Sequence, residues 1–215
     1  MNKWWHFRFR INWPENQLRW WIDIFIFDTI VRQILIENRE EIYLWRVHRR
    51  ATRDQEGHQF TFLCYSQDKT AQLINKKIIS SSALIKLKNA KLLEKYFWKE
   101  EEQDKNNKTN IEDTSDESWP IEIQRSWPFF IMGVSEMLLK LIEQIKENTP
   151  FPDLDLSIPI NSIESYYIKL NDKLSNIWLN NGQHAFFHHI NALFGYVPLL
   201  VKPRSVFDLS MLVKL

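Results

Sequence analysis

The chain has 215 residues, of which 44% are hydrophobic and 26% are charged, values typical of a folded globular protein. Its 28 basic and 27 acidic side chains nearly cancel, so no polybasic field attracts DNA or RNA, and no nucleic-acid partner is expected. No apolar run approaches the ~20 residues of a membrane span, and the start lacks the apolar core of a signal peptide. With a single cysteine, Cys64, and therefore no internal disulfide, a cytoplasmic location is expected.

Residues 1–98 carry the pattern of alternating strands and helices. In WWHFRFRI, at 4–11, apolar side chains alternate with His or Arg from Trp5 onward, which predicts a half-buried strand. Apolar positions at three- and four-residue steps predict a long amphipathic helix over 17–38. The remaining elements expected are strands at 42–50, 58–65 and 92–98 and a helix that begins at Asp68. This order of strands and helices is typical of the ferredoxin-like split βαβ fold.

Tryptophan is abundant, and five of the ten tryptophans crowd the first 21 positions. Neighbouring side chains on a strand point to opposite faces, so Trp4 and Trp5 cannot both point to the same side. Either an aromatic core seals the sheet on both faces, or one member of each adjacent pair meets another element or another subunit. Because tryptophan is enriched at interfaces, the pattern favours self-association, as a homo-oligomer or with a partner protein.

The stretch 99–118 separates two halves. It holds 3 basic and 8 acidic side chains with few apolar ones, which predicts a mobile acidic loop. Beyond it, 119–215 is expected to be helical. We interpret the chain as a single α+β domain, 1–215, with a ferredoxin-like half at 1–98 and a C-terminal helical extension.

Three helices are expected in the extension. Trp127-Pro128 predicts the start of the first helix, whose inward stripe would be Phe130, Val134, Met137, Leu138, Leu141 and Ile145. The second, over 161–180, is expected to end at Asn180-Asn181-Gly182, because Asn and Gly favour the left-handed conformation after a helix. Its inward side chains would be Ile163, Tyr166, Tyr167, Leu170, Leu174 and Trp178. A third, short helix is expected to end at Gly195.

The stretch HRRATRDQEGHQF, at 48–60, places two of the chain's six histidines around arginines at the tip of the predicted hairpin. If the loop closes symmetrically, His48 or Arg50 approaches His58. Arginine offers a two-pronged donor to carboxylate or phosphate, and histidine can donate or accept a proton. The alternative is a solvated tip neutralised by Asp54 and Glu56. The candidate binding residues are Arg46, His48, Arg49 and Arg50, with His58 as a candidate catalytic group.

The late stretch GQHAFFHHINALFGY carries a second group of histidines. His184 and His188 are four residues apart and share a helix face, but no third ligand and no HExxH motif accompanies them, so no metal is predicted. His188 and His189 are candidate catalytic residues, and His184 and Asn191 are candidate binding residues. Alternatively, these are polar side chains between a helix and the sheet. With four glycines the chain has no glycine-rich phosphate motif, and no cofactor is expected.

The order of these pieces resembles the C-terminal, SpaB_C-type elimination domain of class I lantibiotic dehydratases and its stand-alone thiopeptide relatives. The resemblance rests on WWHFRFRI, on IYLWRVHRRATRDQEGHQFTF and on HHINALFG, and spans most of the chain outside 99–118. The matching positions are Arg46 in the first hairpin strand, His58 opening the second, His188 or His189 as the late histidine, and Asn191 as the asparagine.

The resemblance implies a lyase-like reaction. In that family, basic hairpin residues and the late histidine help to eliminate glutamate from glutamylated Ser or Thr of a precursor peptide, and stand-alone relatives can perform a cycloaddition. Gln59-Phe60-Thr61 replaces two arginines that the family carries after its histidine, and Ala192 replaces another. An alternative therefore stays open, in which the chain keeps the fold of this family but performs another reaction or no reaction.

Two hypotheses follow. The first is a tailoring enzyme of peptide natural-product biosynthesis that acts on a peptide or a small acidic acyl substrate, with histidines as acid and base and arginines that hold an anion. The second is a non-catalytic, dimerising module that binds a peptide or a protein. The enzyme requires the hairpin and the late histidines to share one pocket. The module predicts an exposed apolar patch that includes Trp4, Trp5 or Trp20.

Overall fold

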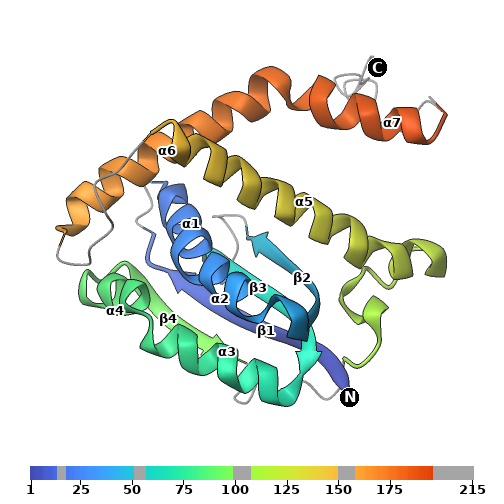
Figure 1. Cartoon of the computed structure of the whole chain (residues 1–215), viewed down its shortest axis with the longest axis horizontal. Coiled ribbons are helices and arrows are strands. Elements are labelled where there is room, and N and C mark those ends of the chain that lie inside the picture. The colour runs from blue at the N-terminus through green and yellow to red at the C-terminus, as the bar shows by residue number, and fades with distance from the viewer. Residues whose placement is uncertain (14–17, 51–56, 99–107, 150–157, 196–215) are drawn as a thin grey trace. The chain divides into compact units, whose positions relative to one another are not determined.

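The chain divides into two compact units, Met1–Asn171 and Asp172–Leu215, and each is described by itself. The computed structural model describes residues 1–13, 18–50, 57–98, 108–149 and 158–195 (Figure 1). The expected loop at the hairpin tip and the expected acidic loop lie partly outside these residues, at 51–56 and 99–107. No helix in the described ranges is long and apolar enough to cross a membrane.

A sheet of four antiparallel strands forms the centre of the described part of the first unit. The strands are β1 (Asn2–Ile11), β2 (Ile42–Arg49), β3 (Gln59–Gln67) and β4 (Leu93–Trp98). Their order across the sheet is β2-β3-β1-β4, so the first strand of the chain lies between β3 and β4. The four predicted strands are confirmed, and so is the α+β class.

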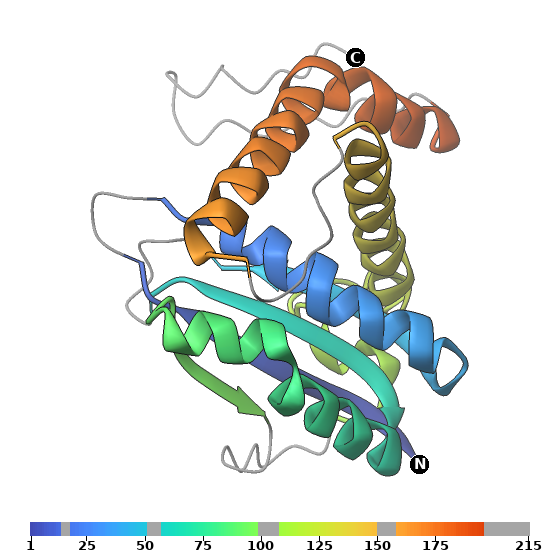
Figure 2. The same cartoon turned by 60° about the vertical axis from the view of Figure 1, so that its left-hand side comes forward.

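Helices cover one face of this sheet, with those before β2 beside those after β3 (Figure 2). The helix predicted over 17–38 is one helical stretch with a turn of π-helix in its middle. Phe27 in that turn contacts the rings of Trp45 and Phe60, which fixes the stretch over β2 and β3. The segments are α1 (Trp20–Ile26), η1 (Phe27–Val31), α2 (Arg32–Asn38), η2 (Arg39–Glu41), α3 (Asp68–Ser80) and α4 (Ser82–Asn89).

The covered face of the sheet is aromatic. Phe7 and Phe9 of β1 and Phe60 and Phe62 of β3 are fully buried, and the rings of Phe7 and Phe62 stack with centroids 5.8 Å apart. Each such side chain stabilises the fold by about 1.5–3 kcal/mol through burial. Trp45 of β2 completes this layer. The core therefore lies between the sheet and α1–α4.

The adjacent residues Trp4 and Trp5 point to opposite faces of the sheet, and neither is exposed. Both are buried, Trp4 at 1% and Trp5 at 2% exposure. The Trp5 indole donates to the Ser66 carbonyl oxygen on the helix-covered side, and the Trp4 indole donates to the Ile111 carbonyl oxygen on the other side. The sheet is thus sealed by aromatic side chains on both faces at this end, and Trp4 and Trp5 form no exposed patch.

Residues 108–118 are ordered against this end of the sheet. The 3-10 helix η4 (Ile111–Thr114) begins with a capping box formed by Asn110 and Asp113. The Tyr65 hydroxyl donates to the Thr109 carbonyl oxygen, and Ile111 packs against the cluster of Trp4, Leu44 and Leu63. The described part of the predicted mobile loop is therefore anchored by apolar and hydrogen-bonded contacts.

The first helix of the extension, α5 (Ile121–Glu147), starts before the predicted Trp127-Pro128, and Pro128 lies inside it. Of the predicted inward stripe, Ile145 is buried and Phe130 is 46% exposed, whereas the others are half-buried: Val134, Met137, Leu138 and Leu141. The side chains that are buried are Pro128, Ser135, Leu139, Ile142 and Ile145. Apolar residues surround much of this helix, so periodicity alone does not select the face that packs against β2 (Figure 1).

α6 (Ile160–Gly182) crosses the boundary between the two units, which lies after Asn171 within this helix. In the first unit, the Tyr167 hydroxyl and the Lys146 ammonium both donate to Oδ2 of Asp28, each over 2.6 Å. Asp28 belongs to the π-helical turn η1. A buried carboxylate therefore joins η1 to α5 and to the first half of α6.

In the second unit, the helix does not stop at Gly182 as predicted. It continues as the π-helix η5 (Gln183–His188) and then as α7 (His189–Leu193). Gly182 keeps a helical φ of −61°. The nearest atom of the Trp178 ring lies 3.0 Å from the position that a β-carbon would take at residue 182. Trp178, predicted to point inward, is 49% exposed. The stop at Gly195, with φ of +71°, is confirmed.

Candidate functional site

Basic side chains line a hollow on the face of the sheet opposite α1–α4. The hollow has a volume of about 450 Å³. Its lining residues are His6 and Arg8 of β1, Arg46, His48 and Arg50 of and just beyond β2, and Gln59, Thr61 and Leu63 of β3. All five ionisable side chains in this lining are basic.

The register of the strands arranges these residues in rows. Leu63 of β3 lies between His6 of β1 and Arg46 of β2, and these three residues form one row across the sheet. Arg8 and His48 lie opposite Thr61 and form the next row. Each row therefore has one arginine and one histidine at its ends and an uncharged residue in its middle.

A third row continues the pattern beyond the end of β2. The Arg50 amide donates to the Gln59 carbonyl oxygen, which places Arg50 beside Gln59. Along β3 the middle residues Leu63, Thr61 and Gln59 are each at most 7% exposed. They are shorter than the arginines on both sides, so β3 forms the neutral floor of a trough and β1 and β2 form its basic walls.

Arg46 is the best fixed of the wall residues. Its Nη2 donates to the Thr114 carbonyl oxygen over 3.2 Å, which ties the guanidinium to the segment that covers the end of the sheet. Its Nε is buried and has no acceptor among the described residues. Leu63 below it belongs to the apolar cluster with Trp4 and Leu44. A donor held in position without an acceptor is suited to an oxyanion.

The environment of the trough changes the acid–base properties of its residues. Desolvation, and to a smaller extent the charges of Arg46 and Arg50, lower the pKa of His48 below its ordinary value of 6.5. Burial also lowers the pKa of the Arg46 guanidinium from its ordinary value. The lowered pKa favours the neutral imidazole of His48, which can accept a proton beside two cations.

Arg49 and His58 lie on the other, helix-covered side of the sheet. Arg49 Nε donates to Oδ2 of Asp23 over 2.6 Å, and His58 Nε2 lies 2.7 Å from Oδ1 of the same carboxylate. His58 Nδ1 lies 2.8 Å from the Arg50 carbonyl oxygen, so both ring nitrogens face oxygen acceptors. Asp23 is fully buried, and this network joins α1 to the hairpin.

Tryptophan rings enclose this network. The Trp13 ring meets the His58 ring edge-on with centroids 3.9 Å apart, and Trp20 does so at 4.9 Å. The Arg49 guanidinium lies over the Trp20 ring at 4.6 Å. At 1% exposure, His58 has no access to solvent in this arrangement. The geometry supports a structural role for His58 and Arg49.

The hairpin residues of the sequence prediction therefore separate into two groups. Arg46, His48 and Arg50 come together in the trough, whereas Arg49 and His58 come together below it. The ring of His58 does reach Arg50, but through the Arg50 carbonyl oxygen rather than its side chain.

Sequence reasoning missed three residues of these two sites. His6 and Arg8 stand on the polar face of the predicted first strand, so the alternation of WWHFRFRI was the available signal. Asp23 is an isolated acidic residue within the apolar stretch WWIDIFIF, which is also a readable signal for a buried carboxylate that requires partners.

The late histidines lie in the second unit and are described by themselves. The rings of His184 and His188 stack with centroids 5.1 Å apart, and His189 lies 5.6 and 5.3 Å from them. Asn191 is 7% exposed. No group of three or more His, Cys, Asp or Glu among the described residues has an arrangement that could hold a metal ion. Catalysis by His188 or His189 stays a prediction.

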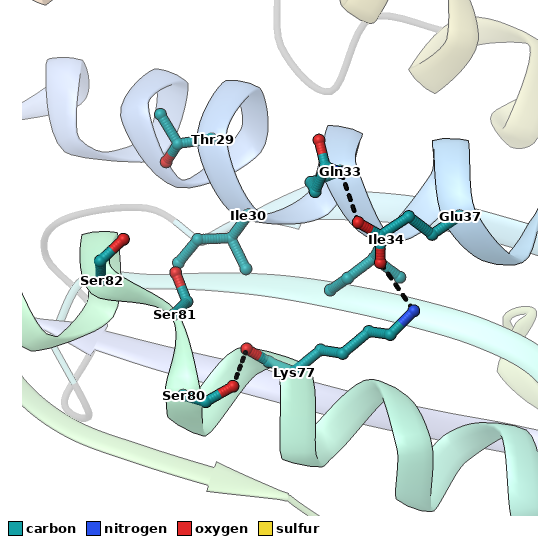
Figure 3. Close-up of a pocket in the computed structure, with 9 residues that line it drawn as sticks. All are labelled: Thr29, Ile30, Gln33, Ile34, Glu37, Lys77, Ser80, Ser81 and Ser82. Carbon is teal, nitrogen blue, oxygen red and sulfur yellow. Dashed lines mark hydrogen bonds and ion pairs between the residues drawn. The ribbon is translucent and has the colours of Figure 1, made fainter. Parts of the chain in front are cut away.

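A second hollow lies between α2 and the α3–α4 corner, with a volume of about 320 Å³ (Figure 3). Its one lysine, Lys77, donates to Glu37 over 2.7 Å and to Asn38 over 3.1 Å. Figure 3 shows the hydroxyls of Ser80, Ser81 and Ser82 along its rim. The lining of this hollow includes the carboxylate Glu37, whereas the described lining of the trough includes no acidic side chain, so the trough is the stronger candidate for an anion site.

Comparison of the chain with protein-family models, with curated proteins and with solved structures gives no match.

Proposed function

We propose that this chain binds an acidic ligand, through carboxylate or phosphate groups, in the trough on the open face of its sheet. The observation that carries the proposal is the charge of the lining, in which every ionisable side chain is basic and the floor is neutral. Arginine forks and histidine donors are the groups that proteins use to hold such oxyanions. The half-buried position of Arg46 strengthens the interaction, since screening by water is reduced there.

The finer fold assignment belongs to the same proposal. A strand–helix–strand–strand–helix–strand order with the sheet order β2-β3-β1-β4 supports a ferredoxin-like split βαβ unit with a helical extension. The resemblance to SpaB_C-type elimination domains remains a proposal that rests on sequence. Of its matched residues, Arg46 lines the trough and His58 is buried beside it.

A tailoring enzyme that acts on a peptide or acidic acyl substrate is the function we favour. Arg46 and Arg8 would hold the anion, and His48 would accept or donate a proton beside it. A neutral histidine between cations is suited to act as a base because its protonated form is disfavoured until an anion arrives.

The alternative is a non-catalytic peptide- or protein-binding module. One observation favours it, namely exposed apolar side chains on the first turns of α5. Those that are at least 44% exposed are Ile121, Ile123, Phe129 and Phe130. The module does not use Trp4 and Trp5, because both are buried.

Titration with inorganic phosphate and with N-acetylglutamate tests the proposal. Both ligands should bind the full chain, and Arg46→Ala should weaken binding about tenfold or more, since a charge-assisted hydrogen bond contributes about 1.5–3 kcal/mol. Calorimetry measures the affinity, and chemical shift changes locate the site. The control is Arg39→Ala, whose guanidinium is exposed and 4.0 Å from Glu136. Equal affinity in both variants would overturn the proposal.

A further inference from the structure

We infer that the ligand of the trough is an extended polypeptide that carries acidic side chains at alternate positions. This inference rests on the proposed function, and it adds the spacing of the negative charges. The rows of the trough are formed by every second residue of β3, namely Leu63, Thr61 and Gln59. Each row brings at least one basic side chain to the trough.

The spacing of the rows follows from strand geometry. Same-face residues of a strand are about 6.6–6.8 Å apart, because each residue rises 3.3–3.4 Å. Alternate side chains of an extended peptide repeat at the same distance. A peptide that runs along β3 would thus present one carboxylate to each row. Three rows match the sequence acidic–any–acidic–any–acidic.

The width of the trough also fits an extended chain. Neighbouring strands lie about 4.8 Å apart, so β1 and β2 are separated by about 9.6 Å across β3. The rows place Arg46 on one wall opposite His6 on the other, and Arg8 opposite His48. The arginines therefore alternate between the two walls, and a carboxylate in either row can reach one of them.

A single-stranded nucleic acid is the competing occupant, because it also carries charges at regular spacing. Such strands are held by stacking of the bases on aromatic rings in addition to charge. The eight lining residues of the trough include no Phe, Tyr or Trp. The near-zero net charge of the chain also argues against a nucleic acid as the ligand. The lining therefore favours a polypeptide.

Fluorescence anisotropy with labelled peptides of identical composition tests the inference. One ten-residue peptide carries three glutamates at alternate positions among serines, and the other carries them consecutively. The alternating peptide should bind the full chain at least tenfold more tightly. Arg50→Ala removes the basic side chain that the third row contributes to the lining and should narrow this ratio, whereas the exposed control Arg39→Ala should keep it. Arg10 of β1 also lies opposite Gln59 but is not among the lining residues. Circular dichroism checks that the variants are folded.

Each other outcome has a defined meaning. Equal binding of the two peptides, with both sensitive to Arg46→Ala, overturns the spacing but leaves the anion site in place. If phosphate binds but neither peptide does, the inference that the ligand is a polypeptide is wrong. Tighter binding of a ten-nucleotide oligothymidylate than of the alternating peptide assigns the trough to nucleic acid. If none of these anions binds, the proposed function itself fails.

Discussion

The two faces of the sheet use the same strands for opposite purposes. On the helix-covered face, Phe60 and Phe62 alternate with residues that point the other way, and the polar groups present there pair with one another around Asp23. On the open face, Thr61 and Leu63 form a neutral floor between basic walls. On the covered face the charged groups pair around a buried carboxylate, whereas the described lining of the trough holds basic side chains and no acidic one.

This difference teaches how a charged side chain can be assigned to structure or to function. Arg49 and Arg46 are three residues apart on one strand, and both are partly buried. Arg49 meets a buried carboxylate at 2.6 Å, whereas Arg46 keeps a buried Nε without an acceptor among the described residues. The face of the strand, more than the residue type, separates the two roles.

The largest expected effect comes from truncation of the covered face. Phe62→Ala should lower the free energy of unfolding by about 3–5 kcal/mol, because it removes a fully buried ring and leaves a cavity. The neighbouring Thr61→Ala, on the trough floor, should change it by about 1 kcal/mol or less. Urea denaturation of both variants measures the contrast. Similar losses would mean that the two faces are equally packed.

A smaller loss of stability is expected from a change in the buried Asp23 network. Asp23→Asn should destabilise the fold by about 1.5–3 kcal/mol, since the hydrogen bonds from Arg49 and His58 lose their charged acceptor. The matched control is Glu136→Gln, which disturbs an exposed pair with Arg39 and should cost about 0–1 kcal/mol. Chemical denaturation measures both. If Asp23→Asn lowers the free energy of unfolding no more than Glu136→Gln does, the Asp23 network stabilises the fold no more than an exposed ion pair.

The smallest effect concerns protonation in the trough. The folded pKa of His48 lies below its ordinary value of 6.5, so the unfolded chain binds this proton more readily. Stability should therefore fall as pH decreases from above 6.5 through the folded pKa, and it should level off below that pKa. An anion in the trough favours the protonated ring, so phosphate should raise the pKa of His48.

Histidine NMR titration measures this change directly. Arg46→Ala should also raise the pKa of His48, because one of the charges that lower it is removed. A His48 midpoint that does not move with phosphate or with Arg46→Ala would separate this residue from the ligand site.

The strands could be predicted from the sequence because apolar and polar side chains alternate with a period of two, and this pattern can be recognised in one strand without knowledge of its neighbours. The same alternation separates Arg46, His48 and Arg50 on one side of the strand from Arg49 on the other. It did not place His6 and Arg8 beside them, because the insertion of β1 next to β3 is set by long-range pairing. A strand order of this kind is a property of the whole sheet.

The helical extension was predicted less well, for two physical reasons. α5 has apolar residues on more than one side, so the predicted stripe through Phe130 missed the face that Ser135 and Leu139 bury. Gly182 was interpreted as a helix stop, but it gives room to the Trp178 ring and remains helical. In both cases a tertiary contact decides between local alternatives that the sequence allows equally.

Cys64 lies on the covered face, fully buried, where desolvation raises its thiol pKa to about 12. Since it is the one cysteine of the chain, the native protein is nearly inert toward alkylating reagents at neutral pH. A cysteine introduced at an exposed position such as Arg39 would then be the single reactive thiol. Spin labels or fluorophores could be attached at that position without removal of the native residue.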